Sequence, residues 1–286
     1  MVTCPGRQRI PLVLSILAFA FLTVGMPHAR QAAFVWPDNR RAAVSLSFDD
    51  GRQSQLDAGV PLLQELGLKV TFYVVPSAVE PRRTAWRAAA AAGHEIGNHS
   101  LRHPCSGNFQ WARDKALENY TLAQMATELD EANNEIDRLL GVRPTTFAYP
   151  CGQTFVGRGT ETRSYVPLVA QRFVAGRGWM GEGANDPAFV DLSRTVAVSM
   201  DDRELDALRA TLDDAIERGQ WLVLAGHDIG VPHGPQVTRV SLLRALAAYL
   251  HAPERNVWVA PVGEVAAWIR KNQAGSSGGS GAARTP

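Results

Sequence analysis

Short apolar strands alternate with helices along most of this chain, and this alternation is the feature that most restricts its fold. The predicted strands lie at residues 42–48, 70–75, 94–97, 145–149, 173–175, 195–200, 221–225 and 257–259. The predicted helices lie at residues 60–68, 84–92, 122–140, 165–172, 202–218, 241–251 and 263–271. Apolar strands that alternate with helices predict a parallel sheet covered by helices. Since no long linker divides the chain, we expect one α/β domain.

Polar residues gather directly after several of the predicted strands. The clusters that follow a strand are Asp49 with Asp50, His99 with His103, Tyr149 with Cys151, Arg177 with Trp179, and His227. In a (β/α) barrel the carboxyl ends of all strands meet on one face, and active sites are built there. The positions of these clusters therefore predict a single (β/α) barrel with one active site.

His99 and His103 are candidate metal ligands. Their spacing of four residues would place both on the same side of one helical turn. Two imidazoles so placed can bind one transition metal ion. Two such histidines also occur in polar loops that face solvent, so the interpretation depends on a third ligand elsewhere in the chain.

Asp49 and Asp50 offer that third ligand. One carboxylate and two histidines make a facial metal triad with positions left open for water and substrate. Because a metal-bound water becomes a nucleophile near neutral pH, the other aspartate can act as general base and His227 as general acid. Asp-Asp-Gly is also a sequence that commonly forms a turn, so these residues could be only a turn. We favour the catalytic interpretation because the histidine pair accompanies it.

Composition and charge exclude some partners. With 45% hydrophobic residues, 20% charged residues and a net charge of +1, the chain has an ordinary globular composition. It has no basic run with interleaved aromatic residues, so we expect no nucleic acid partner.

The first 33 residues have the character of an export signal. Arg7 and Arg9 precede an apolar run from Ile10 to Val24, and small and polar residues follow. This run is shorter than the ~20 residues that span a bilayer as a helix. We expect a cleaved signal peptide, with an uncleaved N-terminal anchor as the alternative and the only membrane contact. The predicted protein is therefore exported: secreted, periplasmic or associated with the cell envelope.

The remaining chain divides into a catalytic domain at residues 34–273 and a tail at residues 274–286. The tail is rich in glycine and serine, which predicts a flexible end without chemistry. Export would leave Cys105 and Cys151 in the mature chain, and cysteines outside the cytosol tend to pair. Both lie beside predicted site clusters, so we expect a disulfide between two active-site loops. Two buried free thiols, or a metal role for Cys151, are the alternatives.

Two of these motifs together resemble those of a known family. Ser47-Phe48-Asp49-Asp50-Gly51 and His99-Ser100-Leu101-Arg102-His103 look like the first two motifs of the polysaccharide deacetylases, the NodB-homology group or carbohydrate esterase family 4. The resemblance extends from about Ala42 to about Ile269. It implies a distorted, TIM-like (β/α)7 barrel. It also implies metal-dependent hydrolysis of N-acetyl groups on an amino-sugar polysaccharide or oligosaccharide, in which a metal-bound water attacks the acetamide and releases acetate.

The same resemblance assigns roles to the first two motifs. Asp49 corresponds to the general base, while Asp50, His99 and His103 correspond to the ligands of a divalent metal. Zn²⁺ is the expected ion, with Co²⁺ and Ni²⁺ as alternatives. The implied partner is an amino-sugar glycan.

The third motif departs from the family pattern. The family commonly has Arg-Pro-Pro-Tyr-Gly, where this chain has Ala148-Tyr149-Pro150-Cys151-Gly152. The arginine that would steady the catalytic base is thus replaced by alanine. The backbone N–H of Cys151 can still serve as an oxyanion donor, since a backbone group needs no particular side chain. We place Tyr149 in the same pocket.

The later motifs depart as well. The aspartate that would tune the acid histidine is missing or displaced around Trp179, and two extra residues precede His227. Trp179 is expected to form an apolar wall for the acetyl methyl group, with a core position as the alternative. Arg177 either replaces a missing polar partner in the pocket or faces solvent. We expect His94 in the barrel framework and His233 in a rim loop.

Two other functions remain open at this point. A hydrolase of the same fold could act on a small non-sugar amide, because the altered motifs indicate a changed pocket. A non-catalytic carbohydrate-binding protein of the cell envelope could have kept the fold without the chemistry. The complete set of predicted metal ligands argues against the second.

Overall fold

The computed structural model describes residues 34–231 and 233–276. The predicted signal or anchor at residues 1–33 lies outside the described residues, as does the tail from residue 277 onward. Within the described ranges, no helix combines the length and the apolar character that a membrane span requires.

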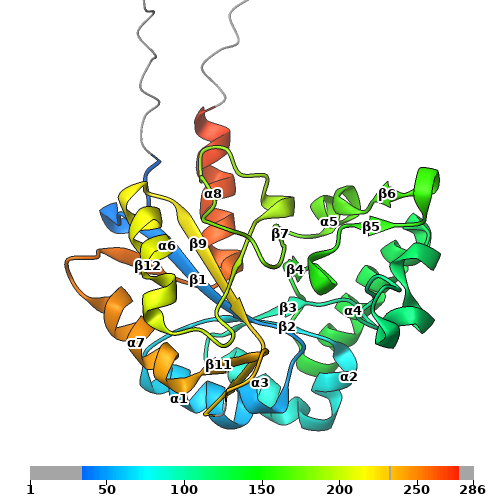
Figure 1. Ribbon diagram of the computed structural model, residues 1–286, viewed down its shortest axis with the longest axis horizontal. Coiled ribbons are helices and arrows are strands. Elements are labelled where there is room, and N and C mark those ends of the chain that lie inside the picture. The colour runs from blue at the N-terminus through cyan, green and yellow to red at the C-terminus, as the bar shows by residue number, and fades with distance from the viewer. Residues whose placement is uncertain (1–33, 232, 277–286) are drawn as a thin grey trace, which may run out of the picture. The chain divides into compact units, whose positions relative to one another are not determined.

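Eight parallel strands form the main sheet (Figure 1). In sheet order these are β7 (Ala175–Arg177), β4 (Thr146–Ala148), β3 (Glu95–Asn98), β2 (Thr71–Val74), β1 (Ala42–Phe48), β9 (Trp221–Gly226) and β8 (Val198–Ser199), while β12 (Val257–Val259) pairs with β1. Two small sheets lie apart from it: antiparallel β5 (Phe155–Val156) with β6 (Arg163–Ser164), and parallel β10 (Asp228–Gly230) with β11 (Val237–Arg239).

The helices connect these strands in the predicted alternation. They are α1 (Val60–Glu65), α2 (Pro76–Val79), α3 (Arg83–Ala91), α4 (Leu122–Leu140), α5 (Val166–Arg172), α6 (Leu205–Glu217), α7 (Val240–His251) and α8 (Val262–Ser276). Helix α4 starts and ends as predicted: Thr121 and Gln124 form a capping box, and Gly141 adopts the left-handed conformation that ends the helix. Helix α8 extends to Ser276, three residues into the segment predicted as a flexible tail.

The two outer strands of this sheet approach each other through a short bridge. Arg177 at the end of β7 pairs with Thr195, three residues before β8 begins. The Gly178 N–H donates to the Thr195 carbonyl, and the Thr195 N–H donates to the Gly176 carbonyl, both at 2.8 Å. A sheet closed by so short a contact is a distorted barrel, so the predicted fold class is confirmed.

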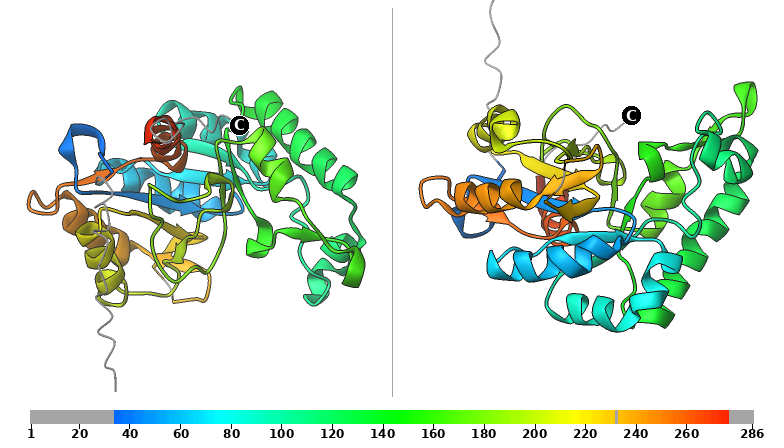
Figure 2. Two further views of the ribbon diagram at one scale, coloured as in Figure 1. Left: turned by 90° about the horizontal axis from the view of Figure 1, so that it is seen from above. Right: turned by 60° about the horizontal axis from the view of Figure 1, so that its bottom comes forward.

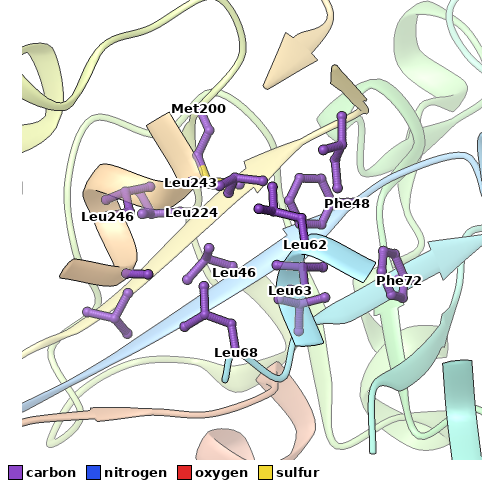
Figure 3. Close-up of a cluster of buried hydrophobic side chains, with 14 of the residues drawn as sticks. Leu46, Phe48, Leu62, Leu63, Leu68, Phe72, Met200, Leu224, Leu243 and Leu246 are labelled. Atoms are coloured by element: carbon purple, nitrogen blue, oxygen red, sulfur yellow. The ribbon is translucent and has the colours of Figure 1, made fainter. Parts of the chain in front are cut away.

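Alternate residues of the central strands pack on opposite faces of the sheet, as strand geometry requires. Leu46 and Leu224 contribute to a large cluster with residues of α1, α6 and α7 (Figure 3). Trp221 and Val223 contribute to a second cluster with residues of α8. The sheet therefore lies between α8 and the helices α6 and α7 (Figure 2, left). Every residue of β1 is buried, which explains its uniformly apolar or small side chains.

Candidate active site

The carboxyl ends of the sheet strands surround a cavity of about 660 Å³. Six strands of the sheet (β1, β3, β4, β7, β8 and β9) end at or are followed by a predicted or newly found site residue. The predicted site residues that line the cavity are Asp49, Asp50, His99, His103, Tyr149, Cys151, Trp179 and His227. The structure thus brings together eight of the nine residues predicted for catalysis, metal binding or the substrate pocket. The ninth, Arg177, does not line the cavity but is fully buried beside it.

A tight turn after β1 presents the two aspartates. Asp50 and Gly51 both have left-handed backbone conformations, with φ of 74° and 68°. Such a conformation is strained for a residue other than glycine and is often found at functional sites. The buried Gln55 amide donates to the carbonyls of Asp49 (2.6 Å) and His227 (3.0 Å), so it joins the ends of β1 and β9.

His99 and His103 do not lie on a helical turn, and this prediction is wrong. They lie in a loop after β3 in which Ser100 and His103 have φ of 65° and 55°. The Asn98 side chain accepts a hydrogen bond from the Ser100 N–H (2.6 Å), and the Ser100 hydroxyl accepts one from the His103 N–H (2.9 Å). These local bonds turn the chain back on itself, as short polar side chains commonly do. The two imidazole centroids consequently lie 4.8 Å apart.

A buried carboxylate from α4 forms hydrogen bonds with the loop that carries His99 and His103. Glu128 is 1% exposed and accepts hydrogen bonds from the backbone N–H groups of Leu101 and Arg102, both at 3.1 Å. It also accepts from the Arg102 guanidinium (2.6 Å) and the Tyr120 hydroxyl (2.7 Å). Four donors satisfy the buried charge, so Glu128 fixes the loop that carries both histidines.

The geometry of Asp50, His99 and His103 fits a single metal ion. Asp50 Oδ1 lies 3.5 Å from the Nε2 atoms of both histidines. A tetrahedral Zn²⁺ with bonds of about 2.0–2.1 Å would hold its ligand atoms about 3.3–3.4 Å apart. The Ala148 carbonyl lies 2.9 Å from His99 Nδ1, which places the proton there and leaves Nε2 free. These three residues can therefore hold a divalent cation.

The protonation of these groups suits a metal site. Burial would raise the pKa of Asp50, but His99 and His103 outweigh it and lower the pKa to about 2. Burial and the neighbouring His99 lower the pKa of His103 to about 4. At neutral pH the carboxylate is therefore charged and the His103 imidazole is neutral, which are the forms that bind metal.

Arg177 takes the place of the arginine missing from position 148. Ala148 and Arg177 are register partners on the neighbouring strands β4 and β7. The Arg177 guanidinium donates to Asp49 Oδ1 and to the Gly178 carbonyl (2.7 Å), and it stacks over Tyr73 at 5.0 Å. Of the two predicted alternatives, the structure agrees with replacement of a missing partner, because Arg177 has no exposure to solvent.

This ion pair sets the charge of Asp49. Burial would raise the pKa of Asp49, but the charge of Arg177, with His99 and His227 nearby, holds the pKa below its usual range. Asp49 is only 3% exposed, yet its carboxylate stays charged at neutral pH because these neighbours hold its pKa low. A charged carboxylate beside the three candidate ligands can accept a proton from a water bound there.

His227 follows β9, the strand paired with β1, and it has a carboxylate partner of its own. Asp201, which follows β8, accepts a hydrogen bond from His227 Nδ1 at 2.6 Å and one from the His227 N–H at 3.1 Å. Burial would lower the pKa of His227, but this hydrogen bond and the charges of Asp49 and Asp201 raise it. The Trp179 ring packs edge-on against the imidazole, with centroids 4.8 Å apart. The aspartate that sequence reasoning found missing or displaced is therefore present as Asp201.

The predicted disulfide is confirmed. Cys105 and Cys151 are bridged, with their Cα atoms 6.0 Å apart. The bond joins the loop of His103 to the turn after β4, and Cys105 Sγ lies 3.7 Å from His103 Nδ1. Because a disulfide sulfur is no thiolate, the bridge excludes both alternatives, free thiols and metal ligation by Cys151.

The two other histidines with a predicted place, His94 and His233, lie where they were expected. His94 is 4% exposed and its Nδ1 accepts a hydrogen bond from the Val70 N–H at 3.3 Å, so it belongs to the barrel framework. His233 is exposed and lies 3.3 Å from Asp202. Neither lines the cavity.

Several site residues were missed by the reasoning from sequence. Asp201 follows a predicted strand, so the rule that found the other clusters could have found it. Arg52 bonds Asp50 Oδ2 at 2.8 Å and Asp228 at 2.5 Å, and Gln55 and Glu128 act through backbone groups. Nothing in the sequence pattern indicates these contacts, because each partner lies far along the chain or depends on loop geometry.

The comparisons with known proteins agree with this arrangement. The family model for polysaccharide deacetylases matches residues 37–164. A peptidoglycan-N-acetylglucosamine deacetylase of Listeria monocytogenes is 27% identical over 212 residues, which are 69% of this chain and 42% of that protein. Chitin deacetylase 1 of Cryptococcus neoformans is 34% identical over 107 residues, 37% of this chain and 20% of that protein.

The fold is also that of a solved structure. A Mycobacterium smegmatis protein assigned to the polysaccharide deacetylases superimposes with a TM-score of 0.61 at 20% identity, covering 84% of this chain and 94% of that one. The chain therefore has the fold of that protein. Over residues 37–164 its sequence is similar to the polysaccharide deacetylase family. It spans less than half the length of the curated relatives that it matches.

Replacing both bridged cysteines should lower the stability of the folded protein. The double variant Cys105→Ser and Cys151→Ser loses the cross-link between two active-site loops, so its free energy of unfolding should fall by about 2–4 kcal/mol. Urea denaturation measures this change, and reduction of the wild type should expose two additional titratable thiols. The reduced wild type, in which the bridge is open but both cysteines remain, serves as the control. An unchanged thiol count on reduction would contradict the bridge.

Proposed function

We propose that this protein is a metal-dependent deacetylase that removes N-acetyl groups from an amino-sugar polysaccharide or oligosaccharide. The observation that carries the proposal is one cavity that holds three candidate metal ligands together with two charged pairs. Asp49 is paired with Arg177, and His227 is paired with Asp201. This arrangement supports a base and an acid that act on the same substrate group.

Asp50, His99 and His103 would hold the cation. Zn²⁺ suits two imidazoles and one carboxylate, and Co²⁺ or Ni²⁺ suits the same ligand set. When bound, such an ion acidifies a water molecule and polarises the acetamide carbonyl. Arg52 holds the second oxygen of Asp50, which leaves Oδ1 directed at the two histidines.

The protein's own groups then move the protons. Asp49 takes a proton from the attacking water as the new carbon–oxygen bond forms, and Arg177 keeps this carboxylate charged beforehand. The carbonyl oxygen becomes an oxyanion, for which the Cys151 N–H is the proposed donor. As the carbon–nitrogen bond breaks, His227 gives its proton to the departing amine, and acetate is released. Trp179 and Tyr149 enclose the acetyl group.

Relatives named as deacetylases of peptidoglycan and of chitin support an amino-sugar glycan as the partner. Such glycans lie outside the cytosol, which agrees with the export signal expected at residues 1–33 and with the disulfide. We therefore propose an exported protein, with membrane contact only through an uncleaved N-terminal segment. Nucleic acid has no place in this proposal.

Acetate release tests the reaction. Chitooligosaccharides and peptidoglycan should release acetate in the presence of Zn²⁺, and a chelator should stop the release. A small non-sugar amide serves as the comparison substrate. Binding of the glycans without release would instead support a non-catalytic carbohydrate-binding protein, and preferred cleavage of the small amide would support a different hydrolase.

Replacing Asp49 or Asp50 in turn should show which aspartate is the general base and which is a metal ligand. Asp49→Asn should lower kcat by at least about 10²–10⁴-fold, because the base is lost, while the protein still binds one Zn²⁺. Asp50→Asn should weaken Zn²⁺ binding itself, because a charged ligand is lost. Zinc titration by calorimetry measures both variants. Loss of metal from Asp49→Asn would show that the two roles are reversed.

Neutralising Asp201 should change the pH dependence of the reaction. The pKa of His227 is raised in the folded protein, so the acid stays protonated to higher pH, and kcat falls only as the pH rises through that pKa. Asp201→Asn removes a charge that raises the pKa, so the descending limb should move to lower pH. The neighbouring Asp202→Asn is a matched control. An unmoved limb in Asp201→Asn would remove His227 from the role of acid.

A further inference from the structure

Two large aromatic side chains beside the cavity have no role in the chemistry described above. Phe109 and Trp111 are 43% and 55% exposed, although both line the cavity. They lie in the segment after His103 that the sequence shows as a polar and aromatic excursion between β3 and α4. Exposed large aromatic side chains that gather at a cavity indicate a binding surface.

The two rings continue a row that starts at the candidate metal ligands. The centroids of His99 and His103 lie 4.8 Å apart, those of His103 and Trp111 lie 5.9 Å apart, and those of Trp111 and Phe109 lie 5.7 Å apart. Phe109 and Trp111 are nearly parallel, with an interplanar angle of 19°. The aromatic surface therefore adjoins the place where the reacting acetamide would lie.

The excursion that carries these rings is held in place by its own contacts. Glu118 accepts hydrogen bonds from the Ser106 hydroxyl (2.5 Å) and the Gly107 N–H (2.9 Å). The Ser106 N–H donates to the Gln153 side chain (2.7 Å). Cys105, at the start of the excursion, is fixed by the disulfide. A surface that is ordered before binding loses little entropy when a ligand arrives.

We propose that Phe109 and Trp111 form a subsite for a second pyranose ring of the same glycan, next to the ring whose acetamide lies at Asp50. This inference rests on the proposed function for its substrate. The C–H face of a pyranose is apolar and carries partial positive charge, which complements the negative face of an aromatic ring. A small non-sugar amide has no such second ring and would leave both side chains unused.

The polar group beside the aromatic surface suits a sugar better than an apolar ligand. Lys115 lines the cavity with its Nζ 5.9 Å from the centre of the Trp111 ring. It can hydrogen-bond the hydroxyl groups at the edge of a pyranose whose face lies on an aromatic ring. An aromatic face combined with nearby hydrogen-bonding groups is the composition expected for a carbohydrate subsite.

The experiment compares chain lengths in matched variants. The probes are N-acetylglucosamine and tetra-N-acetylchitotetraose, and the readout is the ratio of their kcat/KM values for acetate release. Trp111→Ala should lower the preference for the tetramer about tenfold or more, which corresponds to one lost aromatic contact. Trp111→Phe keeps a ring and should recover much of this preference. Phe189→Ala, an exposed aromatic side chain that does not line the cavity, should behave as the wild type.

A binding measurement separates this inference from the proposed reaction. Calorimetry of Asp49→Asn protein with the same two probes should show tighter binding of the tetramer, and adding Trp111→Ala should remove the difference. If the wild type releases acetate but the tetramer preference survives Trp111→Ala, the subsite is wrong and the reaction stands. If no acetate is released but Trp111→Ala still weakens tetramer binding, the reaction is wrong and the subsite stands.

Discussion

The pairing of strand β1 with three other strands is the constraint on which the rest of the structure depends. Its residues pair with β9 along one edge, while β12 and β2 share the other edge. A strand buried on both faces and both edges can carry no charge along its length, so its charged residues can appear only where it ends. Asp49 and Asp50 stand at that point, and the order of the sheet then decides which loops reach them.

Asp49, at the buried end of β1, forms an ion pair with the buried Arg177. Asp49 and Arg177 are almost fully removed from water, where an unpaired charge would cost several kcal/mol. The attraction between the two charges offsets the desolvation cost of burying them. Such a pair contributes little to stability in comparison with apolar packing, so its value lies in holding a charged carboxylate in a fixed orientation next to the candidate metal ligands.

The fold and most of the site could be predicted from the sequence because both follow from local patterns. Apolar strands, helix-ending glycines and polar residues at strand ends placed eight of the nine site residues around the cavity. The helical turn predicted for His99 and His103 was wrong, because spacing alone does not distinguish a helix from a loop closed by Asn98 and Ser100. Contacts such as Glu128 with the Leu101 N–H depend on tertiary packing, which no short pattern records.

Arg177 lies on the strand beside Ala148 and supplies the guanidinium that position 148 lacks, and this bears on how proteins of this fold are compared. The two residues are 29 positions apart along the chain, yet they are direct neighbours across two strands. An arginine can therefore move from one strand to the next while its guanidinium stays beside the same carboxylate. When a sequence alignment shows no arginine at one position, only that strand is known to lack it. The register partner on the adjacent strand should then be checked, because an arginine there can place its positive charge beside the same carboxylate.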